Sequence, residues 1–110
     1  MTPEPDETPR DKIIVQGDPD LQELIPGFLE NRRKDVAILI AANDRGDFQA
    51  IQALGHRLKG DGGGYGFDGL SAIGYALEQA AQERNQETVR SRVAELSSYL
   101  SRVEVIYGAS

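Results

Sequence analysis

The sequence contains no cysteine and only one histidine among its 110 residues. Without cysteine the chain can form no disulfide, no thiol nucleophile and no cysteine-ligated metal centre. One histidine cannot build a histidine-rich metal site. Carboxylates can hold a hard cation, but the Asp and Glu residues are dispersed without calcium-loop spacing, so we expect no metal site. The single imidazole, His56, is therefore the first candidate for chemistry.

Long hydrophobic runs are absent as well. No apolar stretch approaches the ~18 residues that a membrane span requires. The N-terminus also lacks the basic start and hydrophobic segment of a signal peptide. We therefore expect a cytoplasmic protein that has no membrane partner.

Positive charge is scarce, since the sequence has 12 lysines and arginines but 18 aspartates and glutamates, and its net charge is -6. Nucleic-acid binding rewards clustered Lys and Arg, so this balance argues against a nucleic-acid partner. The length fits one domain. We expect a monomer, and the start at Met1 with a short tail favours a free-standing protein.

The N-terminal part divides into two segments. Residues 1–11 are rich in proline and charge, which predicts a flexible tail. Ile13, Ile14 and Val15 follow as a short apolar run that could be an extended segment. We place the domain boundary after residue 17, with a tail and apolar segment at 1–17 and a helical domain at 18–107.

From Asp18 onward, apolar residues recur at the three- and four-residue spacing of helices. The pattern predicts a short helix, a kink at Pro26 and Gly27, and a longer helix whose stripe includes Ile40. The turn at residues 43–47 then leads into a second helix that extends to Tyr65. The apolar positions of this second helix are Phe48, Ile51, Leu54, Leu58 and Tyr65.

Two further helices complete the pattern. Asp68 is a natural N-cap for the third, which carries Leu70, Ile73 and Leu77. The fourth is expected over residues 87–106, and no segment after residue 17 alternates with the period of a strand. The fold class is therefore all-α, an antiparallel four-helix bundle with a short extra N-terminal helix or segment.

His56 lies on the face of the second helix opposite its apolar stripe, so we expect it to face outward. An imidazole with an ordinary pKa near ~6.5 suits the transfer of a proton or a phosphoryl group. Each helical glycine costs roughly 1 kcal/mol relative to alanine, which calls for a compensating gain elsewhere. The glycines predict a groove that another protein's backbone or a phosphate can approach. The neighbours that share the exposed face with His56 include Gln52, Lys59, Gly60, Gly63 and Gly64.

At these residues the chain resembles the histidine-containing phosphotransfer (HPt) domains of two-component phosphorelays. The family's core reads His-x-(Leu/Ile)-Lys-Gly, followed by small residues, an aromatic-Gly-Phe type turn and a leucine. The corresponding residues here are His56-Arg57-Leu58-Lys59-Gly60, Gly62-Gly63-Gly64, Tyr65-Gly66-Phe67 and Leu70. The resemblance extends over the four-helix plan, roughly residues 18–106.

The resemblance implies roles for several residues. His56 would be the phosphoacceptor, and Glu78, 22 residues later, would hydrogen-bond its Nδ1 and leave Nε2 free to attack phosphorus. Lys59 would stabilise the phosphoryl oxygens and Gly60 would admit the donor. Arg57 could aid phosphate or partner binding. Asp61 departs from the family pattern, which has a small neutral residue there, and could tune the choice of partner.

The implied function is a phosphocarrier without an ATP site. It would accept a phosphoryl group from a receiver-domain aspartyl phosphate, or directly from a histidine kinase, and pass it to a response regulator. No cofactor is expected on this chain, because Mg2+ would be bound by the receiver. The alternative is a non-catalytic helical scaffold that docks a signalling partner without carrying phosphate.

Overall fold

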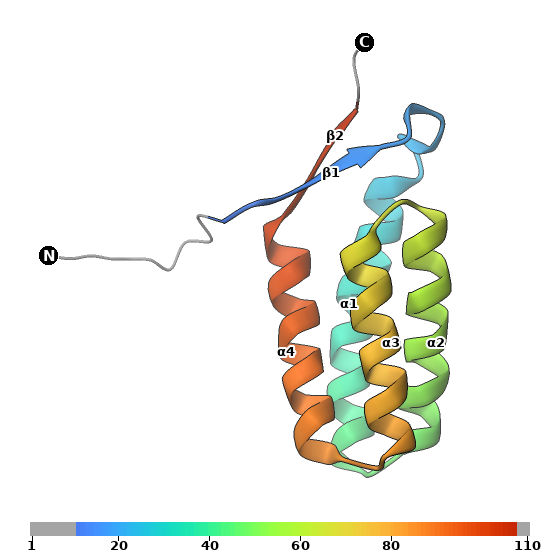
Figure 1. Ribbon diagram of the computed structural model, residues 1–110, viewed down its shortest axis with the longest axis vertical. Coiled ribbons are helices and arrows are strands. Elements are labelled where there is room, and N and C mark those ends of the chain that lie inside the picture. Colours follow the sequence, from blue (N-terminus) through green and yellow to red (C-terminus); the bar gives the residue numbers. More distant parts are fainter. Residues whose placement is uncertain (1–10, 108–110) are drawn as a thin grey trace, which may run out of the picture.

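The computed structural model describes residues 11–107, so the expected flexible tail at 1–10 lies outside the described residues. Four helices form an up-and-down bundle with short connections (Figure 1). They are α1 (Ile25–Asp44), α2 (Phe48–Gly64), α3 (Asp68–Gln82) and α4 (Gln86–Arg102). The predicted four-helix bundle is confirmed. Among the described residues, no helix combines the length and apolar character needed to cross a bilayer.

The start of α1 differs from the prediction. Pro26 does not kink a longer helix, because it occupies the first turn of α1, where a missing backbone N–H removes no intrahelical bond. The short element before it is a 3-10 turn, η1 (Pro19–Leu21), and Asp18 caps it by accepting a hydrogen bond from the Asp20 backbone. Ile40, expected in the apolar stripe, is 49% exposed.

The C-terminal end also corrects the prediction, because α4 stops at Arg102 and residues Val103–Tyr107 form a strand, β2. This strand pairs in parallel with β1 (Ile13–Gly17), the apolar segment at the other end of the chain. Val103, Val105 and Tyr107 alternate inward and pack on the core, which is the period-two pattern of a half-buried strand. The two paired strands lie at the end of the bundle where α1 begins and α4 ends (Figure 1).

The α2–α3 connection is a tight turn. Gly66 adopts a positive φ of 88°, a conformation that favours glycine at the end of a helix. Phe67, not Asp68, is the N-cap of α3; Asp68 is the first helical residue and no side chain caps this helix. Phe67 is fully buried and lies near Phe28, whose ring also stacks on Tyr65 with centroids 4.2 Å apart.

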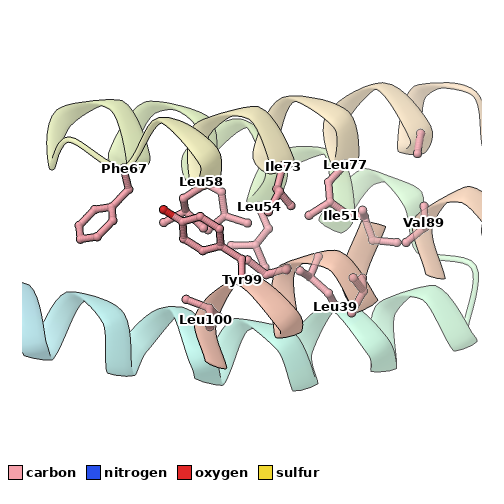
Figure 2. Packing of buried hydrophobic residues seen from close by; sticks show 14 of the residues in the cluster. Leu39, Ile51, Leu54, Leu58, Phe67, Ile73, Leu77, Val89, Tyr99 and Leu100 are labelled. Atoms are coloured by element: carbon pink, nitrogen blue, oxygen red, sulfur yellow. The ribbon is translucent and has the colours of Figure 1, made fainter. Parts of the chain in front are cut away.

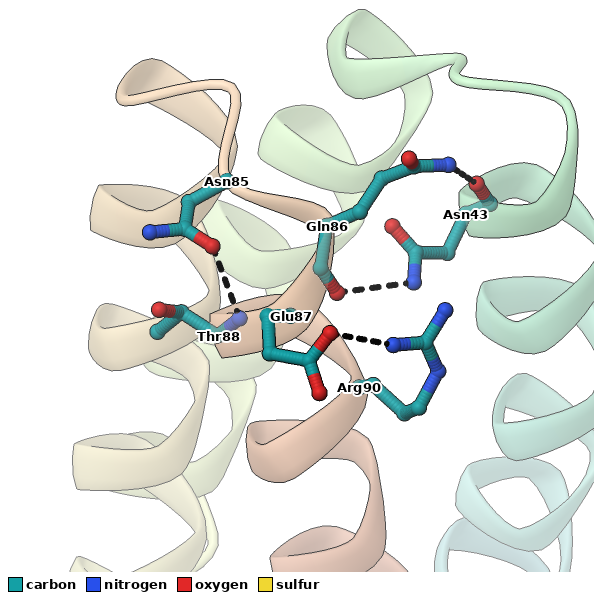
Figure 3. A network of polar contacts seen from close by, with 6 residues as sticks. All are labelled: Asn43, Asn85, Gln86, Glu87, Thr88 and Arg90. Atoms are coloured by element: carbon teal, nitrogen blue, oxygen red, sulfur yellow. Dashed lines mark hydrogen bonds and ion pairs between the residues drawn. The ribbon is translucent and has the colours of Figure 1, made fainter.

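The core runs along the bundle axis and draws on all four helices (Figure 2). At the far end of the bundle, two reciprocal hydrogen bonds join α1 to α4. Asn43 Nδ2 donates to the Gln86 carbonyl at 3.1 Å, and Gln86 Nε2 donates to the Asn43 carbonyl at 2.6 Å (Figure 3). The largest fully buried side chains are Ile25, Leu39, Ile51, Leu58, Phe67, Leu70, Leu77, Val89 and Leu96.

Helices α2 and α3 approach each other so closely that their backbones touch. A Cβ on Gly74 would lie 2.5 Å from the Lys59 amide nitrogen and 2.7 Å from the Gly55 carbonyl oxygen. A Cβ on Gly62 would lie 2.7 Å from the Ser71 amide nitrogen. These separations are too short for any side chain, so glycine is required at the crossing of the two helices.

We therefore predict opposite effects for two glycine-to-alanine substitutions. Gly74→Ala should lower the free energy of unfolding by roughly 1–3 kcal/mol, since the helices must separate to admit a methyl group. Gly60→Ala is the matched control, because the space around Gly60 is open, and it should raise stability by about 0.5–1 kcal/mol. Urea unfolding of both variants tests this, and equal stabilities would contradict the close approach.

Candidate functional site

His56 lies midway along α2, and its side chain is 68% exposed. The helix turns the imidazole away from the core because Leu54 and Leu58, on the other side of the same turns, are buried. A nucleophile in this position is accessible to a second macromolecule. It also remains attached to a rigid, well-packed helix.

Glu78 on α3 reaches the imidazole from the neighbouring helix. Its Oε2 lies 3.1 Å from His56 Nδ1, and its side chain is only 13% exposed. An ionised carboxylate can only accept hydrogen bonds, so the proton of this pair belongs on Nδ1. In the neutral ring this tautomer leaves the Nε2 lone pair free, which is the condition for nucleophilic attack from the exposed edge.

Lys59 shares the same carboxylate. Its Nζ forms an ion pair with Glu78 Oε1 at 3.3 Å, so the two carboxylate oxygens serve two different partners. Lys59 stands one helical turn after His56 on α2, and its side chain is 38% exposed. The site therefore places a positive charge beside the imidazole on the solvent side.

Several opposing effects set the pKa of Glu78. Desolvation is the largest single cause and raises it, but the hydrogen bonds and charges of Lys59 and His56 together outweigh desolvation. The net result is a pKa below the ordinary glutamate value. Glu78 is therefore ionised at neutral pH and keeps its role as an acceptor.

The backbone contact between α2 and α3 determines where these three side chains meet. Gly55, directly before His56, would place a Cβ 2.8 Å from the Glu78 amide nitrogen. Ser71 Oγ donates a 2.8 Å hydrogen bond to the Lys59 carbonyl oxygen and so joins the same two helices again. The register between His56 and Glu78 is thus fixed by the close backbone approach at Gly55 and by the hydrogen bond from Ser71 to the Lys59 carbonyl.

The glycines that follow His56 differ in their surroundings. Gly60 and Gly64 have no atom within 4 Å of an added Cβ, and Gly63 meets only Ser71 Oγ at 3.9 Å. Gln52 is half-buried and Arg57 is exposed. Over residues 11–107, no hydrogen bond or ion pair joins Gln52 or Arg57 to His56, so the structure brings together only His56, Lys59 and Glu78 of the predicted residues.

Asp61 turns toward α1. Its carboxylate lies 3.4 Å from Arg32, which also pairs with the buried Asp35 at 2.8 Å. Burial raises the pKa of Asp35, against the opposing charges of Arg32 and Arg57. Asp61 is therefore part of an α1–α2 charge cluster and leaves the surface of His56 uncovered.

Two residues that matter to the site were not predicted. Tyr75 places its ring 5.4 Å from Lys59 Nζ, and Ser71 forms the hydrogen bond to the Lys59 carbonyl. Tyr75 precedes Glu78 by three residues, a spacing that puts both on one helix face and could have identified it. No comparable sequence pattern points to Ser71 as part of the site. Within the part of the chain that the structure describes, no group of three or more potential metal ligands gathers.

The lowered pKa of Glu78 predicts a pH-dependent contribution to stability. The folded state keeps Glu78 ionised to a lower pH than the unfolded chain does. Its contribution is therefore complete above the ordinary glutamate pKa and is lost as the pH falls through the lowered value. Urea unfolding should show a stability gap between wild type and Glu78→Gln that narrows from about pH 6 to about pH 3. A constant gap would contradict the ionised pairing.

A family model for the Hpt domain matches residues 23–105, which covers all four helices and most of β2. Neither the curated proteins nor the solved structures include a significant match to this chain. The matched segment contains His56, Lys59 and Glu78 together with the helices that position them. The chain therefore belongs to the Hpt domain family, whose members are phosphocarrier modules that interact with receiver domains and histidine kinases in two-component phosphorelays.

Proposed function

We propose that His56 is the phosphoacceptor of this protein. It takes a phosphoryl group from a receiver-domain aspartyl phosphate, with direct transfer from a histidine kinase as the second route, and passes it to a response regulator. The hydrogen bond between His56 Nδ1 and Glu78 Oε2 is the observation that carries this proposal, because in the neutral ring it leaves the Nε2 lone pair free. The cytoplasm is the proposed location.

The chemical step requires little from this chain beyond orientation and charge. Nε2 attacks phosphorus in line, the Nε2–P bond forms, and the bond between phosphorus and the aspartyl oxygen breaks. No proton has to leave the ring, because Nδ1 keeps its proton. The phosphorylated ring then carries a positive charge, which the ionised Glu78 stabilises because its Oε2 lies 3.1 Å from Nδ1. Reversing these events returns the phosphoryl group to an acceptor aspartate.

Lys59 supplies the compensating charge for the phosphoryl oxygens. Its ammonium group already stands beside the imidazole through its ion pair with Glu78. A short movement of this flexible side chain brings Nζ from the carboxylate to the incoming phosphoryl group. The proposal assigns Mg2+ to the receiver, whose own site would stabilise the same oxygens from the other side.

The docking surface in this proposal is the exposed face of α2 around His56. Gly60, Gly63 and Gly64 leave that face without side chains, so a receiver backbone can come within contact distance. Gln52 and Arg57 border it and would contact the partner. Such encounters are expected to be small and transient.

The decisive experiment is the His56→Gln variant. Phosphorylated receivers, and in a second arm autophosphorylated histidine kinases, should transfer acid-labile, base-stable label to wild type. No label should reach His56→Gln, because glutamine offers no nucleophilic nitrogen. Circular dichroism and receiver binding serve as controls and should be unchanged. Absence of label on wild type from every donor, with binding retained, would favour the helical scaffold instead.

A second experiment tests whether the exposed glycines serve docking. Gly60→Ala folds without steric conflict, yet it places a methyl group on the face that the receiver must approach. We expect transfer from a phosphorylated receiver to slow by about 10-fold, corresponding to ~1.4 kcal/mol of transition-state free energy. Labelling by phosphoramidate, a small phosphoryl donor that has no docking surface, should slow far less. Equal slowing with both donors would contradict a docking role.

A further inference from the structure

Tyr75 is a large aromatic side chain that the fold leaves 51% exposed. It lies on α3, three residues before Glu78, on the side of the helix that faces Lys59. The other large apolar side chains of α3 are buried in the core, namely Leu70, Ile73 and Leu77. Burial in the core therefore does not explain the position of this ring.

The ring instead contacts the cation of the site. Lys59 Nζ lies 5.4 Å from the Tyr75 ring centroid, within the range of a cation–π interaction. The same ammonium lies 3.3 Å from Glu78 Oε1. A free lysine side chain samples many rotamers, and fixing it costs up to about 2 kcal/mol of conformational entropy. Two attractive partners on α3 restrict Lys59 to the neighbourhood of His56.

The two partners differ in what they do once a phosphoryl group is present. Glu78 is negatively charged, and it competes with the phosphoryl oxygens for the ammonium group. The aromatic ring attracts a cation through its quadrupole and adds no negative charge near the phosphoryl group. Tyr75 can therefore keep Lys59 close to His56 after the ammonium has turned from the carboxylate toward phosphorus.

We propose that Tyr75 is a positioning residue that holds Lys59 beside His56 for phosphoryl transfer. This inference rests on the proposed function, in which Lys59 stabilises the phosphoryl oxygens. It adds a residue of α3 that acts through Lys59 and does not touch the reacting atoms. The face of the ring, and not its hydroxyl group, provides the interaction.

Phosphoramidate labelling of His56 tests this role without any protein partner. In this reaction Nε2 bonds to phosphorus while the P–N bond of the donor breaks and ammonia leaves. Tyr75→Leu should label about 2- to 5-fold more slowly than wild type, the size expected for an exposed cation–π contact. Tyr75→Phe keeps the ring and should label at nearly the wild-type rate. The effect of Tyr75→Leu should disappear in a Lys59→Ala background.

Two controls separate positioning from a general effect on the fold. Arg84 stands 5.0 Å from the ring centroid of Phe48, which is the first residue of α2 and lies about two helical turns before His56. Phe48→Leu therefore removes the same kind of contact away from His56 and should leave labelling unchanged. His56→Gln should give no label. Urea unfolding of each variant shows whether a slower rate merely follows lost stability.

Nuclear magnetic resonance provides a readout that does not depend on phosphorylation. The ring of Tyr75 should shift the Lys59 Cε protons upfield, and this shift should persist in Tyr75→Phe and vanish in Tyr75→Leu. The inference would be overturned if Tyr75→Leu labelled at the wild-type rate. It would also be overturned if Tyr75→Leu slowed labelling equally in the Lys59→Ala background. A Tyr75→Phe variant as slow as Tyr75→Leu would overturn it as well. Failure of every donor to label His56 would contradict the proposed function. The ring shift still tests the role of Tyr75 in that case, because its absence would show that Tyr75 does not hold Lys59.

Discussion

The main-chain contact between α2 and α3 is the constraint on which the rest of the site depends. Gly55 and Gly74 allow the two backbones to approach within distances that no Cβ could occupy. Gly55 directly precedes His56, and it faces the amide nitrogen of Glu78. The 3.1 Å separation between the imidazole and the carboxylate is therefore set by packing of the backbone. A packed interior resists small displacements, so this geometry is held by the stability of the bundle itself.

Glu78 connects this packing to the chemistry of the site. One of its oxygens accepts from His56 and the other pairs with Lys59, so a single residue orients the imidazole and places the cation. Its side chain is mostly buried at the helix interface, where electrostatic interactions are stronger than in water. Burial alone would raise its pKa and favour the neutral acid, which could also donate a hydrogen bond. The interactions with Lys59 and His56 reverse that tendency, lower the pKa of Glu78 and keep it an acceptor.

Much of this arrangement could be predicted from the sequence, and the failures have identifiable physical causes. The four helices follow from apolar periodicity, and the family resemblance brought His56, Lys59 and Glu78 together as candidates. The strand Val103–Tyr107 was missed because its inward residues Val103, Val105 and Tyr107 are interrupted by an outward Ile106, and because its partner lies at the other end of the chain. Pro26 within an apolar helical pattern predicts a kink, but proline also suits the first turn of a helix, which is where the structure places it. The three-residue spacing from Glu78 places Tyr75 on the right face of α3, but its contact with Lys59 joins two helices, and that contact becomes visible only in the structure.

The glycine-rich part of α2 therefore contains two kinds of glycine. Gly55 and Gly62 lose helix propensity and gain a close contact with α3, so their cost is offset within the fold. Gly60 and Gly64 incur a similar cost, and nothing in the described structure occupies the space beside them. The proposed docking of a receiver would compensate for this cost, because a partner's backbone could then approach the helix at both positions. Both positions lie on the face that carries His56, so the most economical explanation is a partner whose backbone must reach the imidazole.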